Sequence, residues 1–141
     1  MKFELSKDEA AADQLDWAIR LFLDHDAYVA AITLAGAAEE LIGKPLQEQA
    51  VFKQLTQTLS VHSGLDPKSV TQNHLNKAKN WLKHWDEHTD QGRIELELDE
   101  EALQYIVRAL TNFANYDNSL PSEAPRFWEW LQKNRPELFV D

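Results

Sequence analysis

The chain has 141 residues with 43% hydrophobic and 27% charged residues, which suits one globular domain with one core and excludes a disordered protein. The sequence has no cysteine, so disulfides, thiolate catalysis and cysteine-bound zinc are excluded. The formal net charge is -10, and an acidic surface repels phosphate backbones. Broad nucleic-acid binding is therefore disfavoured, although a small basic cleft remains compatible with the composition.

The chain also has no segment that predicts a membrane partner. No apolar run approaches the ~20 residues that are needed to span a bilayer. The first residues, Met1 to Leu5, lack the apolar core of a signal peptide. We therefore expect a cytoplasmic protein.

The first predicted helix begins after Ser6. Ser6 and Glu9 form the S-x-x-E pattern of a capping box, in which each side chain bonds a backbone N–H at the start of a helix. Apolar residues then recur at three- and four-residue steps, which predicts an amphipathic helix that ends near His25. The buried face of this helix should hold Ala11, Leu15, Ala18, Ile19 and Phe22.

The second predicted helix covers residues 27–42 and is rich in alanine. Asp26 precedes it and can serve as its N-cap. Alanines together with Gly36 let a neighbouring helix come close, so we expect this helix to be central and strongly buried. Gly43 followed by Pro45 is a stop signal and predicts its end.

Two further helices are predicted between Pro45 and residue 89. Pro45 suits the first position of a third helix, which Gly64 would end. The pair Asp66 and Pro67 suits the start of a fourth helix, which fades at Thr89. We expect the second and fourth helices to form the centre of the fold. The apolar side of the third helix comprises Val51, Leu55 and Leu59.

A strictly alternating segment runs from Arg93 to Leu98, and two predicted helices follow it. No partner strand is predicted elsewhere, so we interpret the segment as an extended connector; the alternative is an edge strand that pairs with its copy in a dimer. Asp99 can cap a fifth helix that ends near Tyr116, and a sixth helix is expected over residues 123–134.

Together these patterns predict an all-α fold. The chain has no repeat and no low-complexity tract, so we expect a single domain over residues 1–141. The predicted architecture is a helical bundle of five to six helices with short connections and one extended connector.

The fourth predicted helix carries the densest cluster of polar chemistry. Asn80, His84 and His88 recur every four residues, so a continuous helix would stack them on one face. Trp81 and Trp85 are also four residues apart and would share a side. Such aromatic residues either fill a core or anchor a binding partner.

The sequence resembles HEPN-type helical bundles in its opening hairpin and in one short motif. The motif of that family is R-[polar]-x-x-x-H on a later helix, and Lys79-Asn80-Trp81-Leu82-Lys83-His84 is similar to it. The chain departs from the pattern at Lys79, where the ribonucleases of the family place Arg. The hairpin part of the resemblance lies in Ala18, Leu21 and Phe22, in residues 26–31 and in residues 35–41, and the whole covers roughly residues 10–115.

The resemblance implies a homodimer in which two copies of the motif face each other, and in active members the cleft cuts RNA without a metal. His84 would then act as a general acid or base, Asn80 would orient it or the phosphate, and Lys79 would stabilise phosphate charge. Lys does not offer the two-point grip of Arg on phosphate. We therefore favour a dimeric, non-catalytic binding, regulatory or scaffold module with a polar cleft around His84. The alternative is a metal-independent endoribonuclease of the toxin or defence class, with RNA or a nucleotide as its ligand.

Two other hypotheses concern the same cluster. Asn80 and His84 could form a buried polar pair that only fixes packing. His84 and His88, with Glu39 or Glu40 from the second helix, could instead bind a metal or a small molecule. Because the Glu of a His-Glu-x-x-His motif is missing, we assign no metal site and expect no cofactor. The candidate binding residues are His88, Glu39, Glu40, Trp81 and Trp85.

Overall fold

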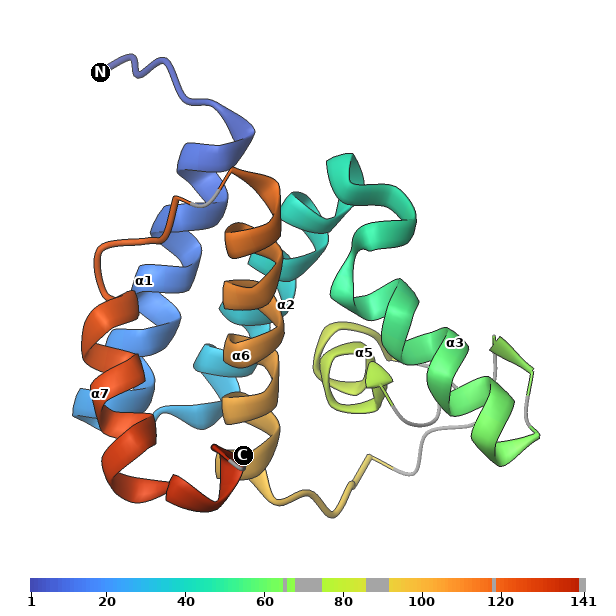
Figure 1. The fold of residues 1–141 in the computed structure, drawn as a ribbon. Helices are drawn as coiled ribbons and strands as arrows, with labels where there is room; N and C mark the ends of the chain where they lie inside the picture. Colours follow the sequence, from blue (N-terminus) through green and yellow to red (C-terminus); the bar gives the residue numbers. More distant parts are fainter. Residues whose placement is uncertain (65, 68–74, 86–91, 118, 140–141) are drawn as a thin grey trace.

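The computed structural model describes residues 1–64, 66–67, 75–85, 92–117 and 119–139. These residues form six α-helices and two short 3-10 helices, and they contain no strand. The predicted all-α fold is therefore confirmed (Figure 1). Among the described residues, no helix combines the length and the hydropathy that crossing a membrane requires.

Helix α1 spans Lys7–His25 and begins as its sequence predicts. The Ser6 hydroxyl accepts a hydrogen bond from the backbone N–H of Glu9 at 3.1 Å, which is half of the expected capping box. We expected Asp26 to act as the N-cap of the next helix, but it does not. It adopts a left-handed conformation (φ 50°) and ends α1, because its backbone N–H bonds the Leu21 carbonyl.

Helix α2 spans Tyr28–Leu46, which is longer than predicted, and the 3-10 helix η1 (Gln47–Gln49) follows it. Gly43 and Pro45 lie inside its last turns, so the predicted stop at Gly43 is wrong. Gly43 serves a close approach instead, because a Cβ at this position would lie 3.3 Å from the Asn112 amide nitrogen of another helix.

The third helix therefore does not open at Pro45. Helix α3 spans Val51–Ser63 and ends at Gly64 in a left-handed conformation (φ 73°), as the sequence predicts. Helix α3 begins later than predicted because Pro45 belongs to the last turn of α2, and η1 follows α2.

The fourth predicted helix is short in the structure. Helix α5 spans Lys77–Lys83, and His84 follows it in an extended conformation (φ -123°, ψ 148°). The prediction that one helical face carries both Asn80 and His84 is therefore wrong, because the helix ends between them. His88 lies outside the described residues.

The last two helices lie close to their predicted positions. Helix α6 spans Leu98–Tyr116, helix α7 spans Ala124–Asn134, and the 3-10 helix η3 covers Pro136–Leu138. The residues before α6, 93–97, have no regular secondary structure, and Leu96 packs against the core. The segment is thus the extended connector that its alternation predicts.

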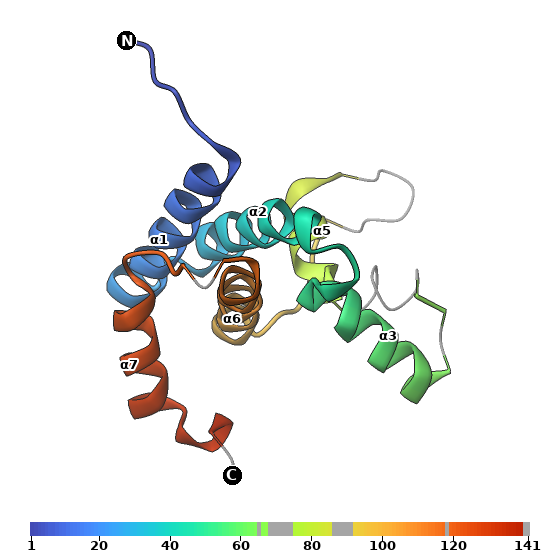
Figure 2. The ribbon, with the colours of Figure 1, turned by 45° about the horizontal axis from the view of Figure 1, so that its top comes forward.

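The centre of the fold is formed by α2 and α6, with α1 packed on α2. Figure 2 shows α1 and α7 on one side of this pair and α3 and α5 on the other. The alanine-rich helix is central, as expected, and Ala31, Ala35 and Ala38 are fully buried. The expectation that the fourth helix shares the centre is wrong, because α5 has only seven residues and α6 offers a longer apolar face.

The packing of α2 predicts a strong position dependence of stability. Ile32 is fully buried, so Ile32→Ala should lower the free energy of unfolding by about 2–5 kcal/mol through lost burial and the cavity left behind. Val29 on the same helix is 47% exposed, and Val29→Ala should change the free energy of unfolding by no more than about 0.5 kcal/mol. Urea denaturation measures both values, and equal losses would contradict this packing.

Candidate functional site

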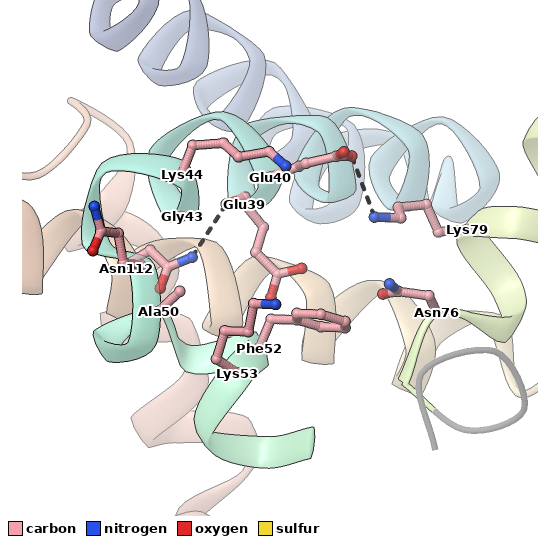
Figure 3. Close-up of a pocket in the computed structure, with 11 residues that line it drawn as sticks. Glu39, Glu40, Gly43, Lys44, Ala50, Phe52, Lys53, Asn76, Lys79 and Asn112 are labelled. Atoms are coloured by element: carbon pink, nitrogen blue, oxygen red, sulfur yellow. Dashed lines mark hydrogen bonds and ion pairs between the residues drawn. The ribbon is translucent and has the colours of Figure 1, made fainter. Parts of the chain in front are cut away.

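A polar cavity of about 210 Å³ lies where α2, α3 and α5 meet. Figure 3 shows the side chains that line it. Glu39, Glu40 and Lys44 come from α2, whereas Lys53 comes from α3 and Lys79 from α5. We call this cavity the polar pocket.

Glu39 lines the polar pocket and belongs to a buried ion pair. Arg108 of α6 donates to both carboxylate oxygens of Glu39, at 2.5 Å from Nε and 2.8 Å from Nη2. Only 3% of Glu39 and 7% of Arg108 are exposed. Arg108 also donates to the Leu75 carbonyl at 2.7 Å and to the Asn76 side-chain oxygen at 3.2 Å. One guanidinium group therefore connects α6 to α2 and to the segment that leads into α5.

Tyr105, almost one turn before Arg108 on α6, supports the same segment. Its hydroxyl donates to the Leu75 carbonyl at 3.0 Å and accepts from the Lys79 backbone N–H at 3.3 Å. The Arg108 guanidinium carbon lies 4.9 Å from the centroid of the Tyr105 ring and 5.8 Å from that of Phe52. These distances allow cation–π attraction on two sides of the buried cation.

Asn112, one turn after Arg108, joins α3 to α2. It is fully buried, and its side-chain oxygen accepts from the Val51 backbone N–H at 2.9 Å. Its amide nitrogen donates to the Glu39 carbonyl at 3.2 Å. Helix α3 has no side-chain bond from its own N-cap residue, so Asn112 satisfies a backbone donor at the start of α3.

Burial controls the electrostatics at the base of the pocket. Loss of solvent raises the pKa of the Glu39 carboxyl above its usual 4.5, although the adjacent Arg108 and Lys79 offset part of this effect. Burial also raises the pKa of the Tyr105 hydroxyl. Both directions indicate a poorly hydrated environment in which interactions between charges are strong.

Lys79 reaches the pocket across the surface of α2. Its Nζ lies 3.6 Å from a carboxylate oxygen of Glu40, and its side chain is 13% exposed. The stem passes over Gly36, where a Cβ would lie only 2.6 Å from Lys79 Cδ. Gly36 thus provides the space that lets Lys79 lie along α2, a role that its place in an alanine-rich helix does not reveal.

The structure separates the residues of the HEPN-like motif. Lys79 lines the polar pocket and a neighbouring cavity of about 440 Å³, but neither Asn80 nor His84 lines either of them. The Asn80 carbonyl accepts from the His84 backbone N–H at 3.0 Å, which ends α5. Asn80 is half-buried, whereas His84 is exposed beyond the helix end.

The other predicted binding residues are dispersed. Glu39 and Glu40 both line the polar pocket, but Glu39 is engaged by Arg108. Trp81 is half-buried and lines a surface depression near residues 93–95, while Trp85 is 70% exposed. In the part of the chain that the structure describes, no group of three His, Cys, Asp or Glu residues could hold a metal ion.

Sequence reasoning missed Arg108 and Asn112, although a signal for them exists. Polar residues recur on α6 at steps of four, three and four residues. They form a second stripe beside the apolar stripe of the same helix. This spacing places one polar edge along the helix. The stripe consists of Glu101, Tyr105, Arg108 and Asn112, and a polar stripe next to the core predicts buried hydrogen bonds.

The chain matches no protein-family model, no curated protein and no solved structure in comparisons with known proteins.

Breaking the buried ion pair should destabilise the fold strongly. Arg108→Met leaves the Glu39 carboxylate buried without its partner and should lower the free energy of unfolding by about 3–5 kcal/mol, whereas the double variant Glu39→Leu/Arg108→Met should recover part of this loss. Arg126 forms an exposed ion pair with Asp24, so Arg126→Met should cost no more than about 1 kcal/mol. Chemical denaturation of the wild type and the three variants tests this prediction. Equal losses in the two single variants would refute it.

Proposed function

We propose that this protein is a non-catalytic helical binding module whose polar pocket holds a small polar ligand. The observation that supports the proposal most is the buried Glu39–Arg108 ion pair, whose Glu39 lines the pocket. Removing two charges from water costs several kcal/mol per ion, so such pairs contribute little to stability by themselves. A concave site with a few converging polar groups and a perturbed carboxyl is the usual form of a ligand site.

The geometry of the HEPN-like motif favours binding over RNA cleavage. A ribonuclease of this type needs its cation and its histidine at the same phosphate. The Lys79 amine lies against Glu40, and His84 lies outside the cavity that Lys79 lines. A net charge of -10 also opposes RNA capture, which depends on neutralising phosphates.

We propose further that the module is a homodimer that uses the outer surface of α6 and α7. An apolar groove of about 420 Å³ lies between these helices and the segment before α7. Trp128 is 49% exposed and Leu120 is 53% exposed at this groove. Aromatic residues of this kind are enriched at protein interfaces. The groove is lined by Val107, Leu110, Thr111, Ala114, Leu120, Ala124, Pro125 and Trp128.

The binding-module proposal predicts little or no ribonuclease activity. Purified protein should leave a mixed pool of single-stranded and structured RNA intact, and His84→Ala should behave in the same way, because Lys79 and His84 do not share a cavity. Gel analysis of the RNA provides the measurement, with Lys79→Arg as a companion variant. Cleavage by the wild type that disappears in His84→Ala would overturn the proposal and favour the ribonuclease.

The dimer proposal predicts a mass of twice 16.3 kDa in solution. Trp128→Glu should shift the protein towards monomer, because it places a charge in the apolar groove. Trp17→Glu is the matched control, since both tryptophans are 49% exposed and Trp17 lies on α1. Light scattering that gives a monomer mass for the wild type at ~100 μM, well above ordinary micromolar affinities, would contradict the dimer.

A further inference from the structure

The charge around the polar pocket has the opposite sign to the charge of the whole chain. Three lysines and two glutamates line the pocket, in a chain of net charge -10. The lysines come from three different helices, and Figure 3 shows the ion pair between Lys79 and Glu40. Such a gathering of cations in an acidic chain produces a local positive potential that attracts anions.

Both carboxylates of the pocket already have cationic partners. Glu39 is bound by Arg108 in the buried ion pair, and Glu40 lies 3.6 Å from Lys79. Among the described residues, neither Lys44 nor Lys53 forms an ion pair. The pocket therefore retains two positive charges that its own carboxylates do not neutralise.

An amide group adds directional hydrogen bonding to these charges. Asn76 is buried and lines the pocket, and Figure 3 shows its side chain turned towards the cavity. Its side-chain oxygen accepts from Arg108, which fixes the amide plane and orients its NH₂ group. An NH₂ group held in this way can donate to an oxygen of a bound ligand.

The size of the cavity restricts the ligand. A volume of about 210 Å³ is below the roughly 300–1,000 Å³ of pockets for drug-sized ligands. It corresponds to several water molecules at about 30 Å³ each. A small ion or a metabolite of a few carbons fits these dimensions.

From charge, hydrogen bonding and size together, we infer that the polar pocket binds a small dianionic oxyanion, of the phosphate or dicarboxylate class. This inference rests on the proposed function and specifies its ligand. Lys44 and Lys53 supply the charge, Asn76 supplies an amide donor, and the Glu39–Arg108 pair holds the base in place. Glu40 competes with the ligand for Lys79.

The competition by Glu40 allows a test in which two substitutions act in opposite directions. Isothermal titration of the full-length protein with inorganic phosphate and, separately, with malonate distinguishes the two oxyanion types; both are titrated at one fixed ionic strength because salt screens exposed charges. Lys53→Gln should weaken binding of the preferred anion about tenfold, the scale of one lost charged hydrogen bond. Glu40→Gln should tighten it, since it frees Lys79 and removes a repelling charge.

The matched control is Lys133→Gln, an exposed lysine on α7 that lies on the other side of the bundle from the pocket. It should leave the dissociation constant unchanged. Lys53 and Glu40 are both exposed, so circular dichroism should show native folding in all three variants. A purely structural role of these residues does not predict opposite changes in affinity.

Three outcomes would overturn the inference. The first is no binding of either anion up to about 10 mM, beyond the millimolar range of weak specific binding. The second is weaker anion binding in Glu40→Gln, or unchanged binding in Lys53→Gln. The third is binding of putrescine or glycerol in place of the anions, which would retain a binding module with a different ligand. Failure of the proposed function itself would appear separately, as RNA cleavage that depends on His84.

Discussion

The ion pair between Glu39 and Arg108 is the interaction on which the rest of the structure depends. Arg108 lies on the central helix α6, and its three nitrogens reach α2 and the segment before α5. An arginine can do this because its planar guanidinium carries five donors in a fixed arrangement. Ala78 and Leu82 of the short helix α5 pack against the core, and polar bonds from Arg108 and Tyr105 of α6 hold the segment that leads into it. Tyr105 and Asn112 extend the same polar edge in both directions along α6.

This buried network also explains why the protein has a polar pocket. Apolar side chains fill the space between α1, α2 and α6, whereas Asn112 and Arg108 of α6 hold the start of α3 and the segment before α5 through hydrogen bonds. Polar groups with fixed partners cannot shift to fill a gap in the way that aliphatic side chains do, so a cavity remains between them. The partners of Glu39 and Asn112 are internal, which leaves the lysines at the rim and the Asn76 amide as the groups that can meet a ligand.

The structure separates the cation and the histidine of the HEPN-like motif. Its cation, Lys79, belongs to the polar pocket and packs over Gly36, while its histidine lies beyond the end of α5. The two residues are close in sequence, but the helix terminus between them sends their side chains to different environments. The motif thus contributes one residue to the candidate site, and the remaining residues come from α2, η1, α3, α6 and the segment before α5.

The sequence by itself determined the helical fold, the capped start of α1, the central alanine-rich helix and the extended connector, because capping and apolar periodicity are local signals. Tertiary structure decided where α2 and α5 end. Helix α2 continues past Gly43, where it packs against Asn112. Helix α5 ends at Lys83, although the sequence pattern predicts a helix to Thr89. It also decided the site: Glu39 and Arg108 are 69 residues apart, and no local pattern links two residues at that separation. Only the packing of α2 against α6 brings them into contact.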